Sequence, residues 1–343
     1  MEIRSIVRPL VGGASLIIII AGLRAASGLL GPILMALFIV LAVSPLVDWL
    51  RRKRVPAWLA HTLVVVGVVL LGLSLIVFLA LSVTQFSAAL PDYRTQLEAQ
   101  VRGLAAWLDS RGVQAEDVLR LNLVSPGRIF SLVISFISGL LGTLSNAGLT
   151  LFIFIYMLLG ASSFGRKLNR GLGQRNPVLT RLESFSRSIS VYILIKTWLG
   201  LLTAIGQTLL LLLLGIDFAL LWGVLSFLFN YIPSIGYIIA LVPPVLMALL
   251  QFGVVKALIV FLGYAIINNL FDVVIGPKYL GKGLDLSTLV TFLAVILWAW
   301  ILGPIGAFLA LPLTVMLKKV FLETYEDSRI LATLMGSDDR DVM

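Results

Sequence analysis

Two ionisable side chains lie inside long apolar stretches of this sequence. Lys196 stands about five residues into the apolar run 191–216, and Asp272 stands about five residues from the end of the run 254–275. A lone charge near the centre of a membrane costs about 2.5–3.5 kcal/mol on insertion scales. Opposite charges at matching depths would therefore stabilise each other, and we expect a Lys196–Asp272 ion pair. The alternative is that each side chain reaches separately to the nearby interface.

Amide side chains and chain-breaking residues accompany this pair. Asn230, Asn268 and Asn269 can bind a polar solute or a cation, or they can join helices through hydrogen bonds. Proline and glycine interrupt two apolar stretches, and a proline inside a helix removes a hydrogen bond and clashes with the preceding turn. The candidate substrate or ion pathway comprises Asn230, Pro233, Gly236, Pro243, Asn268, Asn269, Asp272, Pro277, Gly303, Pro304, Gly306 and Pro312.

Several kinds of chemistry have no residues to support them. The chain has no cysteine and a single histidine, His61, so a thiolate site or a histidine-based metal site is not expected. It contains no glycine-rich phosphate loop and no His-Glu-x-x-His or Gly-x-Ser-x-Gly motif. We therefore expect no cofactor, no metal and no enzymatic activity, which leaves a secondary transporter as the working hypothesis.

The composition is that of a membrane protein. Of the 343 residues 59% are hydrophobic and only 13% are charged, and a soluble domain carries about twice that charged share. The net charge of +9 lies mostly in short clusters beside apolar runs, which is a topology signal rather than a nucleic-acid footprint. The expected partner is the lipid bilayer, and no nucleic acid is expected.

The order of apolar and polar stretches predicts an all-α polytopic membrane protein with about eight hydrophobic segments. We expect helices over about 10–30, 32–50, 57–90, 129–160 and 191–215, followed by the paired halves 218–229 and 235–250, the segment 254–275, and the halves 287–302 and 305–317. The predicted divisions are N-terminal transmembrane helices at 1–90, an extracytoplasmic amphipathic segment at 91–127, transmembrane helices at 128–216 with a basic cytoplasmic loop at 162–190, a transport region at 217–317 and an acidic cytoplasmic tail at 318–343.

The interrupted stretches 217–250 and 287–317 are either long single spans or helical hairpins. As straight helices they would measure about 51 and 46 Å, against about 30 Å for the hydrocarbon core. Because each has proline and glycine at its centre, we favour broken, re-entrant hairpins. Both contain I-G-x-x-x-A-L followed by proline, which suggests an inverted repeat with its binding site at the membrane midplane. The small residues of this motif can instead serve close helix packing.

Lysine and arginine gather on one predicted side of the membrane. If both termini are placed on that side, the basic clusters at 51–54 and 166–187 lie on the same side, and the opposite side carries fewer basic residues. Cytoplasmic loops are enriched in basic residues. We therefore expect a multi-pass protein of the bacterial inner membrane with both termini in the cytoplasm.

The most specific motifs lie in residues 230–314. The stretches NYIPSIG from Asn230, PP from Pro243, GPKYLGKGLDLSTLV from Gly276, WAWILGPIG from Trp298 and LPLT from Leu311 closely resemble the autoinducer-2 exporter family of bacterial membrane proteins. One departure is Val273, which stands where the family often has asparagine, with the acidic Asp272 immediately before it. In an ion-coupled member of the family, that acid would change which cation is preferred.

The resemblance implies eight membrane segments and a homo-oligomer, of which a pentamer is the plausible form. It also implies export of a small polar solute, with autoinducer-2 or a similar signal favoured, by alternating access at the broken helices. Because other members are described as sodium/proton antiporters, a monovalent cation exchanged for protons through Asp272 is the alternative.

Overall fold

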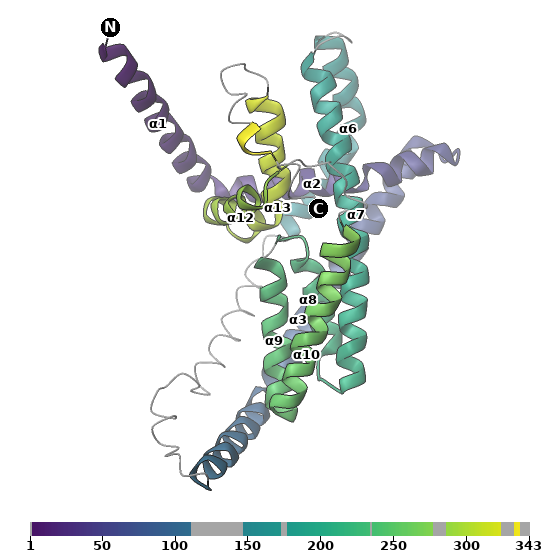
Figure 1. Cartoon of the computed structure of the whole chain (residues 1–343). Helices are drawn as coiled ribbons and strands as arrows, with labels where there is room; N and C mark the ends of the chain where they lie inside the picture. The colour runs from purple at the N-terminus through teal and green to yellow at the C-terminus, as the bar shows by residue number, and fades with distance from the viewer. Residues whose placement is uncertain are drawn as a thin grey trace. The chain divides into compact units, whose positions relative to one another are not determined.

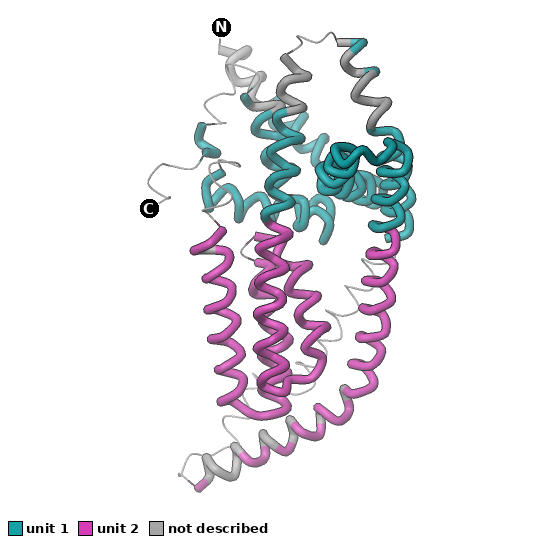
Figure 2. The backbone as a smooth tube through the Cα atoms, turned by 90° about the vertical axis from the view of Figure 1, so that its right-hand side faces the viewer, with its two compact units in different colours: residues 1–68, 146–195, 280–343 teal, residues 69–145, 196–279 magenta. Residues whose placement is uncertain are grey.

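The computed structural model describes residues 2–110, 147–172, 177–233, 235–276, 286–323 and 333–336, and all regular structure in these ranges is helical. Figure 1 shows the arrangement of the helices along the chain. The chain divides into two compact units, drawn in two colours in Figure 2. Unit 1 comprises residues 1–68, 146–195 and 280–343, and unit 2 comprises residues 69–145 and 196–279. The predicted all-α polytopic class is confirmed.

The helices follow one another with short connections wherever the structure describes the chain. In order they are α1 (Glu2–Ala25), α2 (Ser27–Arg52), α3 (Ala57–Ser110), α6 (Ala147–Leu172), α7 (Pro177–Leu214), α8 (Ala219–Phe229), α9 (Ile235–Phe252), α10 (Val254–Asn268), the π-helix η1 (Asn269–Ile275), α12 (Thr288–Leu302), α13 (Pro304–Met316) and the π-helix η2 (Leu317–Leu322). Among the described residues, five stretches are long and apolar enough to cross a membrane, namely Ser27–Arg52, Ala57–Ala89, Ser184–Leu214, Ile235–Phe252 and Val254–Asp272.

Two predicted helix boundaries in the N-terminal part of the chain differ from the structure. The first two helices meet at Ala26 rather than near residue 31, and Pro32 lies inside α2. Helix α3 continues through Pro91 to Ser110, so the external segment predicted to begin at 91 starts as an extension of this helix. The rest of that segment, 111–127, lies outside the described residues.

Much of the stretch 162–190, predicted as a basic cytoplasmic loop, is helical, because α6 continues to Leu172 and α7 begins at Pro177. Its cytoplasmic position stays a prediction. Arginine and lysine are good helix formers, so basic composition alone does not interrupt a helix. Pro177 occupies the first position of α7, where a missing backbone N–H costs nothing. Only the connection at 173–176 between the two helices lies outside the described residues.

Unit 1 contains the second interrupted stretch, and that stretch folds back on itself. Trp298 Nε1 of α12 donates to Thr314 Oγ1 of α13 at 3.0 Å, although the two residues are 16 positions apart and a continuous helix would separate them by about 24 Å. Helix α13 packs against α2, where Phe308 meets Phe38 edge-on at 5.4 Å between ring centroids. Helices α2 and α6 share a core around Phe154.

Unit 2 contains the first interrupted stretch, which is likewise a hairpin. Gln251 at the end of α9 donates from Nε2 to Asp217 Oδ2 before α8 at 2.6 Å, across 34 positions that would extend about 51 Å as one helix. Helix α10 packs along α9 (Figure 1). The apolar core between these helices is centred on Trp222, which Phe86 of α3 meets edge-on at 5.5 Å between ring centroids.

Equivalent glycines allow both hairpins to close. A Cβ on Gly236 would overlap the backbone oxygen of Phe229, and a Cβ on Gly306 would overlap that of Trp298. Both glycines lie in the first turn of the helix that follows the break, Gly236 as the second residue of α9 and Gly306 as the third residue of α13. The motif noted in the sequence therefore has the same packing role twice, which is the role that small residues commonly serve in membrane helix contacts.

The end of the α8–α9 hairpin away from its break is tied to α3 by polar contacts. Tyr93 donates from its hydroxyl to Asp217 Oδ2 at 2.7 Å, and Trp222 Nε1 donates to the backbone oxygen of Asp217 at 3.1 Å. Tyr93 lies beyond the apolar part of α3, which ends at Ala89. Burial and the neighbouring Asp217 carboxylate raise the pKa of the Tyr93 phenol above its ordinary value of 10.

We expect Tyr93→Phe to destabilise the protein by about 1.5–3 kcal/mol, because Asp217 loses a hydrogen bond to a charged acceptor. This difference in stability between the variant and the wild type should stay constant from neutral pH to about pH 10. It should shrink above that value, since a raised pKa gives stability that is lost as the pH rises. Melting curves of the purified protein check both points. Tyr156→Phe, at a position 65% exposed, is the control and should melt like the wild type.

Candidate functional site

The structure brings the two intramembrane charges of unit 2 together. Lys196 Nζ of α7 lies 2.7 Å from Asp272 Oδ1 of η1, and the side chains are 11% and 23% exposed. Both groups belong to stretches long and apolar enough to span a membrane. An ion pair at this depth lowers the cost of placing each charge in a low-dielectric medium. Its role in transport remains a prediction.

The ammonium of Lys196 also connects the ion pair to the break of the first hairpin. Nζ donates to Asn230 Oδ1 at 3.1 Å, and the next residue, Thr197, hydrogen-bonds through its hydroxyl to that of Tyr231 at 2.6 Å. A Cβ on Gly200, one turn further along α7, would lie 2.6 Å from Asn230 Nδ2. Close approach at this glycine therefore places the Asn230 amide directly against α7.

Asp272 belongs to a π-helix that the sequence did not predict. The i→i+5 hydrogen bonds of η1 change the register of side chains relative to the preceding α10, and in this register Asp272 faces Lys196. Asn269, at the junction, donates from Nδ2 to the backbone oxygen of Ala265 at 2.8 Å. The Asn269 side chain is exposed and its hydrogen bond stays within its own helix, so Asn269 is not part of the group formed by Lys196, Asp272 and Asn230.

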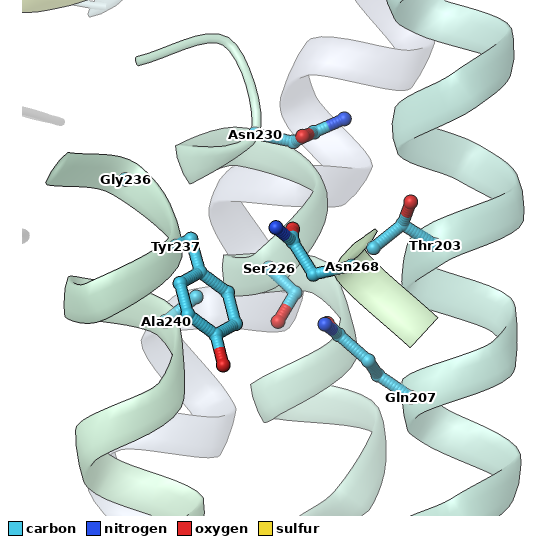
Figure 3. Close-up of a pocket in the computed structure, with 8 residues that line it drawn as sticks. All are labelled: Thr203, Gln207, Ser226, Asn230, Gly236, Tyr237, Ala240 and Asn268. Carbon is cyan, nitrogen blue, oxygen red and sulfur yellow. The ribbon is translucent and has the colours of Figure 1, made fainter. Parts of the chain in front are cut away.

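Beside the break lies a small polar pocket formed within unit 2. Its lining residues come from α7, the α8–α9 hairpin and α10, and they are Thr203, Gln207, Ser226, Asn230, Gly236, Tyr237, Ala240 and Asn268. Figure 3 shows the side chains of Gln207, Ser226 and Asn268 gathered between these helices, with Tyr237 across from Gln207. About 10 Å³ is open to the centre of a water molecule, which is room for about one water.

Among the polar atoms around this pocket that have no hydrogen-bond partner in the described residues, three belong to α7 and to the break. They are Thr203 Oγ1, Gln207 Oε1 and Asn230 Nδ2, on side chains that are 2%, 1% and 8% exposed. A buried polar atom without a partner costs about 1–3 kcal/mol. Such a group in a native structure calls for an explanation such as a bound water, an ion or a ligand. These atoms make the pocket the candidate site for a polar molecule.

The backbone of the break does not provide these free groups. The N–H of Asn230 donates to Ser226 O at 2.9 Å, and that of Ile232 donates to Phe229 O at 2.8 Å. The N–H of Gly236 donates to Ile232 O at 3.1 Å. Because local turns satisfy these amides, hydrogen bonds to a molecule in the pocket would have to come from its side chains.

The other predicted pathway residues lie elsewhere. Pro243 is buried inside α9, and Pro233 accepts at its backbone oxygen from the N–H of Ile235 within the break. Gly303, Pro304, Gly306 and Pro312 belong to unit 1, where Gly303 adopts a φ of 69° between α12 and α13. Pro312 lines a cavity of unit 1 whose lining residues are all apolar. Pro277 lies outside the described residues.

Sequence reasoning missed four of the polar lining residues, Thr203, Gln207, Ser226 and Tyr237. A signal existed for two of them, because Lys196, Thr203 and Gln207 recur at seven and four positions along an apolar helix and so share one face. Polar residues on one face of a membrane helix point toward the protein interior. The other two could not be assigned without knowing that α8 and α9 form a hairpin.

The charge balance of the site favours a neutral solute over a cation. Lys196 already neutralises Asp272, so a cation at this carboxylate would have to displace an ammonium at 2.7 Å. Among the described ranges, no cluster of three histidine, cysteine, aspartate or glutamate residues could hold a metal ion. Hydrogen bonding by amides and hydroxyls is thus the chemistry that the pocket offers.

Comparisons with known proteins agree on one family. The family model described as AI-2E family transporter matches residues 14–326. The "AI-2 transport protein TqsA" of Escherichia coli K12 is 31% identical over 94% of this chain and 93% of its own length. The "Putative transport protein YhhT" of the same strain is 31% identical over 94% of this chain and 92% of its length. A "Putative transport protein" of Haemophilus influenzae is 32% identical over 96% of each chain. These relatives do not support the sodium/proton alternative.

Proposed function

Because the chain belongs to the AI-2E family of transporters, we propose that it exports autoinducer-2 or a similar small, uncharged polar solute through the pocket of unit 2. Autoinducer-2 is a hydrophilic furanone whose hydroxyl groups both donate and accept hydrogen bonds. The pocket offers amides and hydroxyls with a compensated charge pair beside them. The name of the similar protein TqsA supports this choice of solute.

The observation that carries the proposal is the set of unpartnered polar atoms on Thr203, Gln207 and Asn230. Hydroxyl groups of a solute can pair with all three, as donors to the Gln207 oxygen and as acceptors from the Asn230 amide. A site built to hydrogen-bond a hydroxyl strongly rejects an analogue that lacks it. The pocket would therefore select a hydroxylated solute over an apolar one of equal size.

The pocket must widen during transport, since in this structure it holds about one water molecule. The element that would move is the break at Asn230–Pro233. It is linked to α7 by side-chain hydrogen bonds, from Lys196 to the Asn230 amide oxygen and between the hydroxyls of Thr197 and Tyr231, which can break and form again. Movement of the break would open the pocket and alter the ion pair in one step. The α12–α13 hairpin, its counterpart in the repeat, would alternate with it in an inverted-repeat mechanism.

A flux measurement tests the proposal. The purified full chain is reconstituted into vesicles loaded with autoinducer-2, and release is followed by mass spectrometry of the external solution. We expect release well above that from protein-free vesicles, and competition by other small hydroxylated furanones but not by their deoxygenated analogues. Release equal to that from empty vesicles would contradict the proposal. Proton movement driven by added sodium would favour the antiport alternative instead.

Gln207→Leu should lower the rate of release at least tenfold while leaving the fold intact. The substitution keeps the volume of the side chain but removes the buried Gln207 Oε1, which has no partner among the described residues. We expect melting at the wild-type temperature or above it, because an unpaired polar atom is lost. Gln85→Leu, at an exposed position of α3, is the matched control. Equal release by Q207L and the wild type would exclude this residue from the pathway.

We further propose an inner-membrane location, cytoplasmic termini, and hairpins that enter and leave on the same membrane face. The distribution of basic residues supports the orientation of the termini. Reporter fusions at each terminus check that orientation, and labelling of the helix connections checks the hairpins. A homo-oligomer follows from the family resemblance, and light scattering of the purified protein measures its mass.

A further inference from the structure

The turn between α2 and α3 carries a run of four basic side chains, Arg51, Arg52, Lys53 and Arg54, all of them exposed. Within the part of the chain that the structure describes, none of the four pairs with a carboxylate. The nearest acid in the sequence, Asp48, is also exposed and forms no ion pair within that part. An uncompensated local charge of at least +3 is therefore concentrated in a few residues.

This basic turn lies where two membrane-spanning stretches meet. One stretch ends at Arg52 and the next begins at Ala57, so the four charged groups lie at the end of the first stretch and in the short connection to the second. Trp49 and Trp58 flank the turn and are 53% and 71% exposed. Exposed tryptophan beside a span is typical of the membrane interface, where the lipid headgroups lie. The basic groups thus stand at headgroup depth.

The backbone holds the turn in a defined shape. The N–H of Lys53 donates to Leu50 O at 3.0 Å, and that of Val55 donates to the same oxygen at 3.2 Å. Arg54 adopts a φ of 66°, the left-handed conformation that reverses the chain toward α3. Lys53 Nζ lies 5.8 Å from the centre of the Trp49 ring, whereas the three exposed arginines make no aromatic contact with the described residues.

We propose that this basic turn is a binding site for the phosphate headgroup of an anionic phospholipid such as phosphatidylglycerol. Guanidinium groups bind phosphate oxygens through paired hydrogen bonds, and the two tryptophans would pack against the glycerol and upper acyl region. A zwitterionic lipid brings its own cation to the site, so an uncompensated cluster favours the anionic lipid. The proposal is independent of the transported solute.

Native mass spectrometry of the full chain in detergent tests this site by counting bound phosphatidylglycerol and phosphatidylcholine. We expect the wild type to prefer phosphatidylglycerol by about tenfold or more, with the preference weakening as salt is added. The variant R51Q/R52Q/R54Q should lose the preference. The variant K167Q/R170Q/R187Q removes the same charge from exposed positions of α6 and α7 and should keep it.

Equal binding of the two lipids by the wild type would overturn the proposal. So would an equal loss of preference in both triple variants, since net charge rather than a site would then explain binding. Melting temperatures in phosphatidylcholine report on folding, and we expect no change because the substituted groups are exposed. Should R51Q/R52Q/R54Q melt lower, the single variants R51Q and R54Q give the same test. Each should lose part of the preference, and full retention by both would contradict the site.

Discussion

Neutralising either member of the Lys196–Asp272 pair should abolish measurable release of solute and destabilise the protein. Lys196→Met leaves a carboxylate, and Asp272→Asn leaves an ammonium, without its partner at 2.7 Å. Removing one member of a buried pair costs about 3–5 kcal/mol, and the lower end applies here because both side chains are partly exposed. Melting temperature and vesicle flux measure the two effects separately.

Two double variants separate the function of the pair from its structural role. The swap K196D/D272K restores opposite charges and should recover much of the stability and part of the flux. The neutral pair K196M/D272L should fold, because isosteric apolar replacements of buried ion pairs are often neutral or stabilising, yet it should not transport. Wild-type flux in K196M/D272L would show that the charges only hold the helices together.

Valine at either hairpin glycine should prevent the hairpin from closing. A Cβ on Gly236 or Gly306 overlaps a backbone oxygen, and backbone, unlike a side chain, cannot rotate away. Forcing extra atoms into a packed contact costs about 1–3 kcal/mol, and these contacts belong to the upper end or beyond. We expect Gly236→Val and Gly306→Val to yield little folded protein, as size-exclusion profiles and melting curves would show.

Gly67→Ala provides the control for these substitutions. Gly67 lies in α3 with no atom within 4 Å of the position that its Cβ would take. The change should alter stability by no more than about 1 kcal/mol, mainly through helix propensity. If Gly236→Val and Gly306→Val folded as well as Gly67→Ala, the hairpin packing described for the two units would be wrong.

The sequence predicted the features that depend on hydrophobicity and chain breaking. Apolar length identified the spans, and the breaks before Gly236 and at Gly303 fall where proline and glycine interrupt the apolar pattern. Matching depths within their spans were enough to suggest that Lys196 and Asp272 meet. These inferences succeeded because the low-dielectric membrane penalises polar groups and broken backbone so strongly that their positions carry information.

The features that sequence reasoning missed depend on contacts between distant segments. The π-helical register around Asp272 has no composition signal, and Ser226 and Tyr237 line the pocket only because α8 and α9 fold back on each other. The continuation of α3 through Pro91 was missed because the change from apolar to charged composition after residue 90 was taken as the start of a separate external segment. The basic stretch at 162–190 was assigned to a loop from charge alone, although arginine and lysine favour helices.

Thiol labelling at Thr203 tests the central claim most directly, since the wild-type chain contains no cysteine and each introduced thiol is unique. Thr203→Cys, in vesicles, should react with a small water-soluble thiol reagent as the pocket opens, and saturating autoinducer-2 should slow that reaction at least tenfold. Leu202→Cys, at the 42% exposed apolar neighbour within the same membrane-spanning stretch, should stay unreactive because we expect lipid rather than water around it. Equal reactivity at both positions, or labelling at 203 unaffected by solute, would contradict a solute site in this pocket.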